Sequence, residues 1–305
     1  MKFSVRDLVK KKMEPEKNEE TVFLSKDQED LQEKNLIWIF AYRRSGTTWL
    51  ANELLSHNTR FMDEPLLGLH IGRTQLMKKG IQSTFEIQKH RNDYFFAEEY
   101  QNTWKFYLRK LILNRIYSQF HDLTHKIVIK EPTGSYGADI LASCLPNSKI
   151  IIMLRDGRDV MDSVLDALKE GGWENEKGHI TLSLKNRIEK LQVQCNHWNF
   201  VIDCILKAYE FHNKDRRLIL KYEDLRKDTL NELKKNYNFC QIQIGDETLK
   251  QLVEKSKFEN IPQNERGSGK FKRFASPGKW KENFTDEETK IIENIIGNTL
   301  QKLGY

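Results

Sequence analysis

The residues of this sequence that are best suited to chemistry lie in the stretch LIWIFAYRRSGTTWL, residues 36–50. Arg43 to Gly46 place two cations, a hydroxyl and a glycine between an apolar run and a helical pattern that opens at Thr47. Backbone amides around Ser45 to Thr48 would be unpaired at a helix N-terminus, where an anion binds readily. Arg44 adds a permanently charged fork suited to a terminal phosphate or a leaving sulfonate. The stretch therefore predicts an anion site, with an ordinary glycine turn as the alternative.

Compared with the nucleotide-binding pattern GxxxxGK[ST], the stretch keeps only part of the signature. Gly46 and Thr48 match, whereas Ala41 replaces the first glycine and Thr47 replaces the lysine. That lysine normally reaches the β- and γ-phosphates of a nucleoside triphosphate. Its replacement argues against a γ-phosphate site and leaves Arg44 as the cation of the turn.

Two further groups of polar residues follow apolar runs. Lys130 and Glu131 come directly after the run KIVIK, and Arg155 opens RDGRD after the run KIIIML. Arg155 and Ser163, two helical turns further on, can converge on one phosphate, whereas a turn linked by salt bridges is the alternative. Glu64, before a proline in RFMDEPLLGLH, could deprotonate an acceptor hydroxyl. An ordinary loop carboxylate is the alternative for Glu64.

The elements that must position these side chains alternate along the chain. Short apolar runs predict buried strands at residues 36–42, 126–130, 149–154 and 218–220. Helical patterns at 98–120, 138–145, 181–212 and after Thr285 separate or follow them. Alternating strands and helices imply a three-layer α/β fold, a parallel sheet flanked by helices. The carboxyl ends of its strands, where Lys130 and Arg155 fall, are where ligands bind in such sheets.

Composition limits the alternatives. The chain has 305 residues, of which 38% are hydrophobic, so it can bury a full core. Its 50 Lys and Arg are offset by 44 Asp and Glu, and the formal charge of +6 does not indicate a nucleic-acid binder. No apolar run approaches membrane-spanning length and no leader pattern is visible, so a cytoplasmic protein without membrane contact is expected. Four widely spaced cysteines predict buried reduced thiols and no metal site.

Together these motifs resemble the sulfotransferases that use 3′-phosphoadenosine 5′-phosphosulfate (PAPS), over about residues 35 to 300. YRRSGTTWL is similar to that family's 5′-phosphosulfate loop, YPKSGTTWL, with Arg44 in place of the usual lysine. LRDGRDVMDSV resembles its 3′-phosphate motif, with Arg155 and Ser163 at the Arg and Ser positions. LILKYEDL resembles its strand ending in YEDL. The resemblance implies the P-loop-like sulfotransferase fold and binding of PAPS or its product PAP without a metal.

The resemblance also implies which residues hold the nucleotide. Residues 264–281 resemble the family's RKGxxGDWK segment, with Phe274 and Ala275 replacing Lys and Gly. The 3′-phosphate contact there would rest on Arg273, with Arg266 as a substitute. The implied nucleotide-binding residues are Arg44, Ser45, Gly46, Thr47, Thr48, Trp49, Arg155, Ser163, Tyr222, Ser256, Phe258 and Arg273.

The expected catalytic residues are Arg44, Glu64 and Lys130. The catalytic histidine of the small-molecule branch, in a KTHLP-like motif, is missing here because the strand continues as Lys130-Glu-Pro-Thr. DEPLL resembles the EPL loop of carbohydrate and bacterial sulfotransferases, which makes Glu64 the first candidate for the base and Glu131 the second. Lys130 keeps the family's lysine position, and Arg44 is restricted to an electrostatic role.

The function expected from the sequence is transfer of a sulfonyl group to a hydroxyl or amine of a small molecule. An ATP-dependent phosphotransferase and a non-catalytic adenine-nucleotide-binding protein are the alternatives. The expected organisation is a charged arm at residues 1–34 without chemistry and a single domain at 35–305. Insertions at 66–125 and 165–182 would shape the acceptor pocket, and a mobile basic flap at 264–281 would close over the phosphate. His197 is interpreted as a surface or packed histidine.

Overall fold

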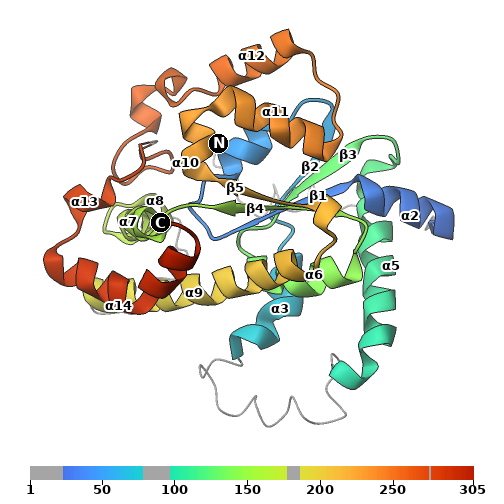
Figure 1. Cartoon of the computed structure of the whole chain (residues 1–305), viewed down its shortest axis with the longest axis horizontal. Coiled ribbons are helices and arrows are strands. Elements are labelled where there is room, and N and C mark those ends of the chain that lie inside the picture. The colour runs from blue at the N-terminus through green and yellow to red at the C-terminus, as the bar shows by residue number, and fades with distance from the viewer. Residues whose placement is uncertain (1–22, 78–96, 177–185, 275) are drawn as a thin grey trace, which may run out of the picture.

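The core of the molecule is a parallel five-stranded sheet with the order β2-β3-β1-β4-β5 (Figure 1). The computed structural model describes residues 23–77, 97–176, 186–274 and 276–305. The strands are β1 (Leu36–Ala41), β2 (Thr59–Asp63), β3 (Lys126–Lys130), β4 (Lys149–Leu154) and β5 (Arg217–Lys221). Every neighbouring pair runs parallel, which confirms the predicted α/β class.

Helices cover both faces of the sheet, and their side chains form two separate apolar cores. From β1, Trp38 and Phe40 point into one core, and Ile37 and Ile39 point into the other. Successive strand residues face opposite sides, so a central strand covered on both faces must be apolar throughout. This requirement explains the uninterrupted apolar runs from which the strands were predicted.

Figure 1 shows the three layers. Helices α10, α11 and α12 lie above the sheet, and α6, α9 and α14 lie below it. The helices are α2 (Lys26–Asn35), α3 (Leu67–Met77), α5 (Gln101–Phe120), α6 (Ala138–Cys144), α7 (Gly157–Leu168), α8 (Trp173–Glu176), α9 (Arg187–Phe211), α10 (Tyr222–Lys227), α11 (Thr229–Cys240), α12 (Asp246–Lys255), α13 (Trp280–Asn283) and α14 (Asp286–Lys302). Helix α14 opens with the predicted cap, since Thr285 and Glu288 form a reciprocal capping box.

The strand order decides where a ligand can bind. Strand β1 lies between β3 and β4, and the chain passes from β3 through α6 to β4 without entering β1. Such a switch in strand order opens a crevice beyond the carboxyl ends of the strands. The segments that follow β1, β3, β4 and β5 begin with Tyr42, Glu131, Arg155 and Tyr222. The fold thus gathers the motifs found in the sequence at one edge.

Three elements differ from the sequence-based expectation. Strand β2 occupies residues assigned to a loop, and it is a half-exposed edge strand without an apolar run. Helix α2 covers residues 26–34 of the predicted charged arm and Asn35, and it is not confined to the surface, because Glu29 and Glu33 are buried. Both carboxylates receive hydrogen bonds from Arg109 of α5. The helix after the anion-binding turn continues as a π-helix at Trp49–Leu54, in which Leu55 N–H donates to Leu50 O at 2.9 Å.

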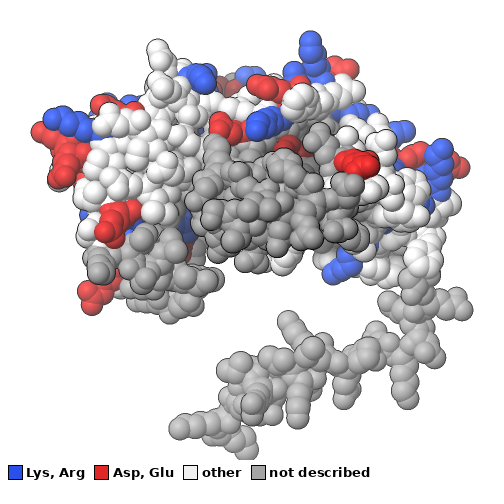
Figure 2. Space-filling view, turned by 90° about the horizontal axis from the view of Figure 1, so that it is seen from below, with Lys and Arg blue, Asp and Glu red and all other residues white. Residues whose placement is uncertain are grey.

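Other sequence-based expectations concern the surface and the cysteines. All four cysteines are buried and form no disulfide, as predicted. On the face shown in Figure 2, basic and acidic side chains are interspersed. Within the described residues, no helix is both long and apolar enough to cross a bilayer. The division into an arm and one domain stays a prediction, and parts of the arm and of both insertions lie outside the described residues.

Candidate active site

A cavity of about 1640 Å³ opens at the carboxyl edge of the sheet, and the loop after β1 forms part of its wall. Ser45 and Thr47 of this loop are buried. Gly46 has a φ of 92°, and a Cβ atom there would lie 2.7 Å from the Tyr222 ring. Only glycine fits both the backbone conformation and the close approach. The sequence motif therefore forms the predicted strand, turn and helix start.

Arg44 connects the loop to two distant segments. Its Nε donates to Ser163 Oγ at 3.0 Å, and its Nη2 donates to the carbonyl oxygen of Phe271 at 2.7 Å. The guanidinium carbon lies 5.4 Å and 5.1 Å from the ring centroids of Trp173 and Phe271. Burial lowers the pKa of Arg44 to about 10, with Arg43 and Arg155 adding to the shift against Glu174. Arg44 therefore remains positively charged at neutral pH. It lies next to Ser163, one of the residues predicted to hold the 3′-phosphate.

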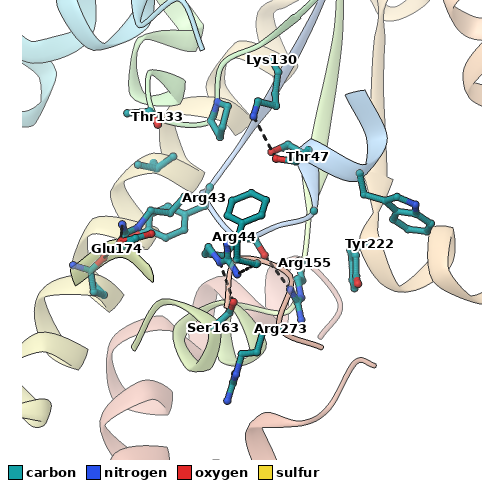
Figure 3. A pocket seen from close by; sticks show the side chains of 18 of the residues that line it. Arg43, Arg44, Thr47, Lys130, Thr133, Arg155, Ser163, Glu174, Tyr222 and Arg273 are labelled. Carbon is teal, nitrogen blue, oxygen red and sulfur yellow. Dashed lines mark hydrogen bonds and ion pairs between the residues drawn. The ribbon is translucent and has the colours of Figure 1, made fainter. Parts of the chain in front are cut away.

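Arg155 and Tyr222 form the next part of the wall (Figure 3). The Arg155 guanidinium carbon lies 4.5 Å from the centroid of the Tyr222 ring, and its Nη1 donates to the Arg44 carbonyl at 3.0 Å. Within the described residues, Arg155 forms no ion pair. Burial raises the pKa of Tyr222. Arg155 thus presents a positive charge to the cavity that no carboxylate balances directly.

Aromatic side chains gather beside these cations. Trp49 meets the Tyr222 ring edge to face at 6.1 Å, and its Nε1 donates to the carbonyl oxygen of Ser256 at 3.0 Å. The Arg226 guanidinium lies 5.4 Å from the Trp49 ring centroid. Trp49, Tyr222, Ser256 and Phe258 all line the cavity. Residues from three separate predicted motifs therefore meet at one place suited to a flat base.

Lys130 joins the other side of the loop to two carboxylates. Its Nζ lies 3.3 Å from Thr48 Oγ1, 3.2 Å from Glu64 Oε1 and 2.7 Å from Asp63 Oδ1. The Lys130 side chain is only 4% exposed. The structure thus brings Lys130, the loop and Glu64 together, as predicted. Asp63, at the end of the unpredicted strand β2, was missed because its partners lie elsewhere in the chain.

The two carboxylates considered as a base occupy different environments. Glu64 lines the cavity, pairs with Lys130 through Oε1 and accepts a hydrogen bond from Thr133 through Oε2. Glu131 is fully buried and accepts hydrogen bonds from the amides of Leu66 and Gly68, at 3.2 and 3.1 Å. Burial raises the pKa of Glu131 to about 7, against the hydrogen bonds from those amides. Glu131 thus holds the loop that carries Glu64. The backbone of Glu64 in this loop is left-handed, with a φ of 47°.

The predicted basic flap, of which residue 275 lies outside the described part, contributes Phe271 to Phe274 to the cavity wall. Arg273 is placed in this wall, but its guanidinium is paired with Asp162 of α7 at 2.6 Å. Arg266 lies 5.3 Å from the Phe258 ring centroid and donates to the Phe258 carbonyl. The structure therefore puts both proposed 3′-phosphate arginines in contact with protein groups.

A hydrogen-bonded network on the remaining wall was not predicted. Arg43 donates to Glu174 at 2.7 Å and to Gln194 at 3.2 Å, and the Tyr42 hydroxyl donates to Gln194 at 2.9 Å. The Tyr42 hydroxyl also lies 3.2 Å from Nδ1 of His197. Burial, with a contribution from Arg43, lowers the pKa of His197 to about 4. His197 is therefore a neutral, cavity-lining side chain at neutral pH.

The arrangement is that of an anion-binding site. Cations, a glycine turn and a carboxylate converge at a switch point of a parallel sheet, and aromatic rings flank them. Within the described residues, no group of three or more His, Cys, Asp or Glu side chains is placed to hold a metal ion. Fold and site together define an α/β protein with a P-loop-like anion site.

Comparison with known proteins identifies the family. The sulfotransferase domain model matches residues 34–304, and the chain belongs to this family, which confirms the resemblance found in the sequence. The chain is 29% identical over 169 residues to the amine sulfotransferase of Oryctolagus cuniculus, covering 49% of this chain and 53% of that protein. It is 25% identical over 161 residues to sulfotransferase 2B1 of Mus musculus, covering 48% and 46%. The matched region spans about half of these relatives.

Solved structures support the same fold. Mouse sulfotransferase SULT7A1 complexed with PAP matches with a TM-score of 0.54 at 15% identity, over 89% of this chain and 88% of that one. Retinol dehydratase in complex with androsterone and the inactive cofactor PAP matches with a TM-score of 0.51 at 16% identity, over 88% and 81%. These similarities confirm the predicted P-loop-like sulfotransferase fold.

Proposed function

We propose that this protein transfers the sulfonyl group of PAPS to a hydroxyl or amine of a small molecule by direct in-line displacement. The observation that carries the proposal is the position of Lys130, whose Nζ contacts both the loop residue Thr48 and the carboxylate Glu64. One cation thereby joins the predicted phosphosulfate site to the predicted base. Membership of the sulfotransferase family supports the same conclusion.

The residues of the cavity fit the donor nucleotide. Arg155 offers a cation that no carboxylate of the described residues neutralises, next to Ser163, and both line the cavity. Trp49, Tyr222 and Phe258 offer aromatic surface for adenine. The loop amides around Gly46 and the Arg44 guanidinium are suited to the 5′-phosphosulfate. PAP, the product nucleotide, is bound in the solved structures of two proteins with this fold.

In the proposed mechanism, Glu64 accepts the proton of the attacking hydroxyl or amine as the oxygen or nitrogen bonds to sulfur. The electron pair of the breaking sulfur–oxygen bond stays on the departing 5′-phosphate. Arg44, Lys130 and the loop amides stabilise the negative charge that develops there. Glu131 is the less suitable base because its oxygens are buried and already bonded to the loop amides.

The acceptor side of the cavity favours a compact organic molecule. Apolar side chains dominate this part of the wall, including Leu66, Leu69, Pro132, Leu168, Phe200 and Val201. Helix α9 adds the polar groups of Lys190, Gln194, Asn196, Asn199 and the neutral His197. Such a lining binds apolar bodies and orients them through few hydrogen bonds. An alcohol, phenol or amine fits better than a long anionic polysaccharide. The expected cytoplasmic location and lack of nucleic-acid or membrane partners stay predictions.

Calorimetric titration with PAP tests the donor site, with ATP and magnesium as the comparator. We expect metal-free binding of PAP to the wild-type protein. Arg155→Ala is expected to weaken this binding by about 10-fold or more, because a charge-assisted contact is lost. Preference for ATP with magnesium would contradict the proposal and favour the phosphotransferase alternative.

Single-turnover transfer from PAPS to a panel of small alcohols, phenols and amines tests catalysis. Glu64→Gln is expected to lower the rate about 10²-fold or more, since it removes the proton acceptor without changing the shape of the side chain. Asp63→Asn is the matched control because Asp63 contacts the same lysine, and it should lower the rate much less. A larger loss for Asp63→Asn would transfer the role of base to Asp63. PAP binding without any transfer would favour the non-catalytic nucleotide-binding alternative.

A further inference from the structure

Helix α7 carries three carboxylates on one face, and each of them contacts the basic flap. Asp159, Asp162 and Asp166 are spaced three and four residues apart, so they share one face of the helix. Their side chains are buried, at 2, 4 and 7% exposure. A buried carboxylate is costly unless charges and hydrogen bonds compensate it. The flap, residues 264–281, supplies most of that compensation.

The outer two carboxylates fix the two ends of the flap. Asp166 accepts hydrogen bonds from Ser268 Oγ at 2.8 Å and from the amide of Gly269 at 2.7 Å. Asp159 accepts from the amides of Gly278 at 2.7 Å and Trp280 at 3.2 Å. Side chains of one helix therefore hold the backbone of an otherwise irregular segment.

The central carboxylate binds the middle of the flap through Arg273. Asp162 accepts two hydrogen bonds from the guanidinium, at 2.6 and 3.1 Å, and a third from Asn283 at 3.0 Å. Arg273 Nε also lies 3.1 Å from Asp166 Oδ2. The Arg273 side chain is 10% exposed. Its single positive charge is thus shared by two buried carboxylates.

Arg155 and Arg273 line the same cavity but differ in charge balance. Arg155 forms no ion pair with any described residue, whereas Arg273 forms two. Moving Arg273 onto an anion would leave Asp162 buried without its cation and Asp166 paired with Lys169 alone, which is strongly unfavourable. An incoming phosphate is therefore expected to meet Arg155 and to leave Arg273 on α7.

The contacts with α7 also determine where the flap meets the nucleotide site. Phe271 to Phe274, between the two end contacts, line the cavity, and the Phe271 carbonyl accepts the hydrogen bond from Arg44. Ser163, which accepts the other Arg44 bond, is the neighbour of Asp162 on α7. Helix, flap and phosphosulfate loop are thus coupled through three residues.

We propose that Asp159, Asp162 and Asp166 are positioning residues that clamp the flap over the nucleotide, and that Arg273 is the tether of this clamp. Arg273 then acts through Asp162 and does not recognise the 3′-phosphate. The inference rests on the proposed nucleotide site but assigns to Arg273 a role different from the one that the sequence motif implies.

Two nucleotides that differ only in the 3′-phosphate distinguish a tether from a phosphate contact. Dissociation constants of PAP and adenosine 5′-phosphate would be measured for Arg273→Gln, Asp162→Asn and the double variant. We expect each single variant to weaken both nucleotides by the same factor, about 10-fold. The double variant should bind each nucleotide no more weakly than the weaker-binding single variant does, because both substitutions break the same Arg273–Asp162 ion pair. Arg155→Gln is the matched control and should weaken PAP selectively.

Selective weakening of PAP by Arg273→Gln would overturn the proposal, as would effects of Arg273→Gln and Asp162→Asn that simply add. A purely structural role would lower the thermal unfolding midpoint and leave both dissociation constants unchanged, which would equally overturn it.

Hydrogen exchange without nucleotide tests the clamp independently of the proposed function. The amides of Gly269, Gly278 and Trp280 are bonded to Asp166 and Asp159. Asp162→Asn should speed exchange at these amides and leave the sheet amides of β1 and β4 unchanged. Unchanged exchange at the flap would overturn the clamp. If the wild-type protein failed to bind PAP, the proposed function would fail while this result would still stand.

Discussion

Two irregular segments line the cavity and meet at Arg44 and Phe271, and they are held in different ways. The loop at residues 42–48 lies between a strand buried on both faces and a helix, so its path is determined by the core of the domain. The flap at residues 264–281 is held by polar contacts with three carboxylates of α7, about one hundred residues earlier in the chain. The loop has no freedom to move without disturbing the core. Release of the flap would break its hydrogen bonds and the Arg273 ion pairs but would leave the core intact.

The glycines of the two segments show the same contrast. Gly46 and Gly278 both have a positive φ, of 92° and 83°. A Cβ atom at Gly46 would collide with the Tyr222 ring, whereas one at Gly278 would meet no atom within 4 Å. Glycine is needed at Gly278 for its backbone conformation alone, but at Gly46 for close packing as well. The difference indicates that the loop forms a rigid half of the binding site, whereas the flap forms a half that is held by polar contacts.

The largest expected effect concerns the cations of the two halves. Lys130→Met should lower kcat by about 10²- to 10³-fold, because a buried charge beside the loop is lost from the transition state. Lys272→Met is the matched control, since Lys272 lines the same cavity from the flap. Its effect on kcat should be less than about 10-fold. Single-turnover rates at saturating donor measure both.

Equal losses of kcat for the two lysine variants would contradict the division into a catalytic loop and a clamping flap. A folded-state control is the far-ultraviolet circular dichroism of each variant, which should match the wild type.

The pH dependence of stability should differ in sign between the two halves. Glu131, below the loop that carries Glu64, has a pKa raised by burial from 4.5 to about 7. The folded state therefore binds this proton more tightly than the unfolded state, and stability falls as pH rises between these values. The expected fall is about 3 kcal/mol. Glu131→Gln should remove it, as measured by urea unfolding from pH 4 to 8.

Asp166 should show the opposite dependence. Burial acts to raise its pKa, but hydrogen bonds from Lys169, Gly269 and Ser268 outweigh this effect and keep the pKa below 3.8. Its contribution is present above pH 3.8 and is lost as pH falls further. The free energy of unfolding of Asp166→Asn should therefore approach that of the wild type at acidic pH. Divergence of this variant from the wild type at low pH would refute the assignment.

The smallest expected effect separates the two glycines. Gly46→Ala should reduce the free energy of unfolding by about 2 kcal/mol or more, through backbone strain and displacement of the Tyr222 ring. Gly278→Ala should reduce the free energy of unfolding through backbone strain alone, by about 1–2 kcal/mol or less. Urea unfolding at pH 7 compares them. A larger loss for Gly278→Ala would show that the flap, and not the loop, is the more tightly constrained segment.

The sequence predicted the sheet and the loop well because both depend on local patterns. Buried strands require continuous apolar runs, and the anion-binding turn requires glycine and hydroxyl residues beside a helix start. Strand β2 was not predicted because an edge strand such as TRFMD is half exposed and lacks an apolar run. Asp63, at its end, was missed with it.

The remaining features depend on partners far apart in the chain. Among the carboxylates of α7, Asp159 suggested only a turn linked by salt bridges, and Asp162 and Asp166 carried no prediction. Nothing near them in the sequence shows that the flap binds them. The link from Arg43 to Glu174 and Gln194 likewise joins segments more than 130 residues apart. His197 was expected to be a surface or packed histidine, and it packs against Tyr42, but its place in the cavity wall was not predicted. No local pattern marks such contacts.

Helix α2 has a practical consequence for where this domain can be cut. The family match begins at residue 34, within the last turn of α2. Arg109 is bonded to Glu29, Asp30 and Glu33, all of which precede that boundary. A protein trimmed to the family match would leave this partly buried guanidinium without its carboxylates and would uncover the α5 surface beneath. We therefore expect a stable domain to include Ser25, the residue that caps α2.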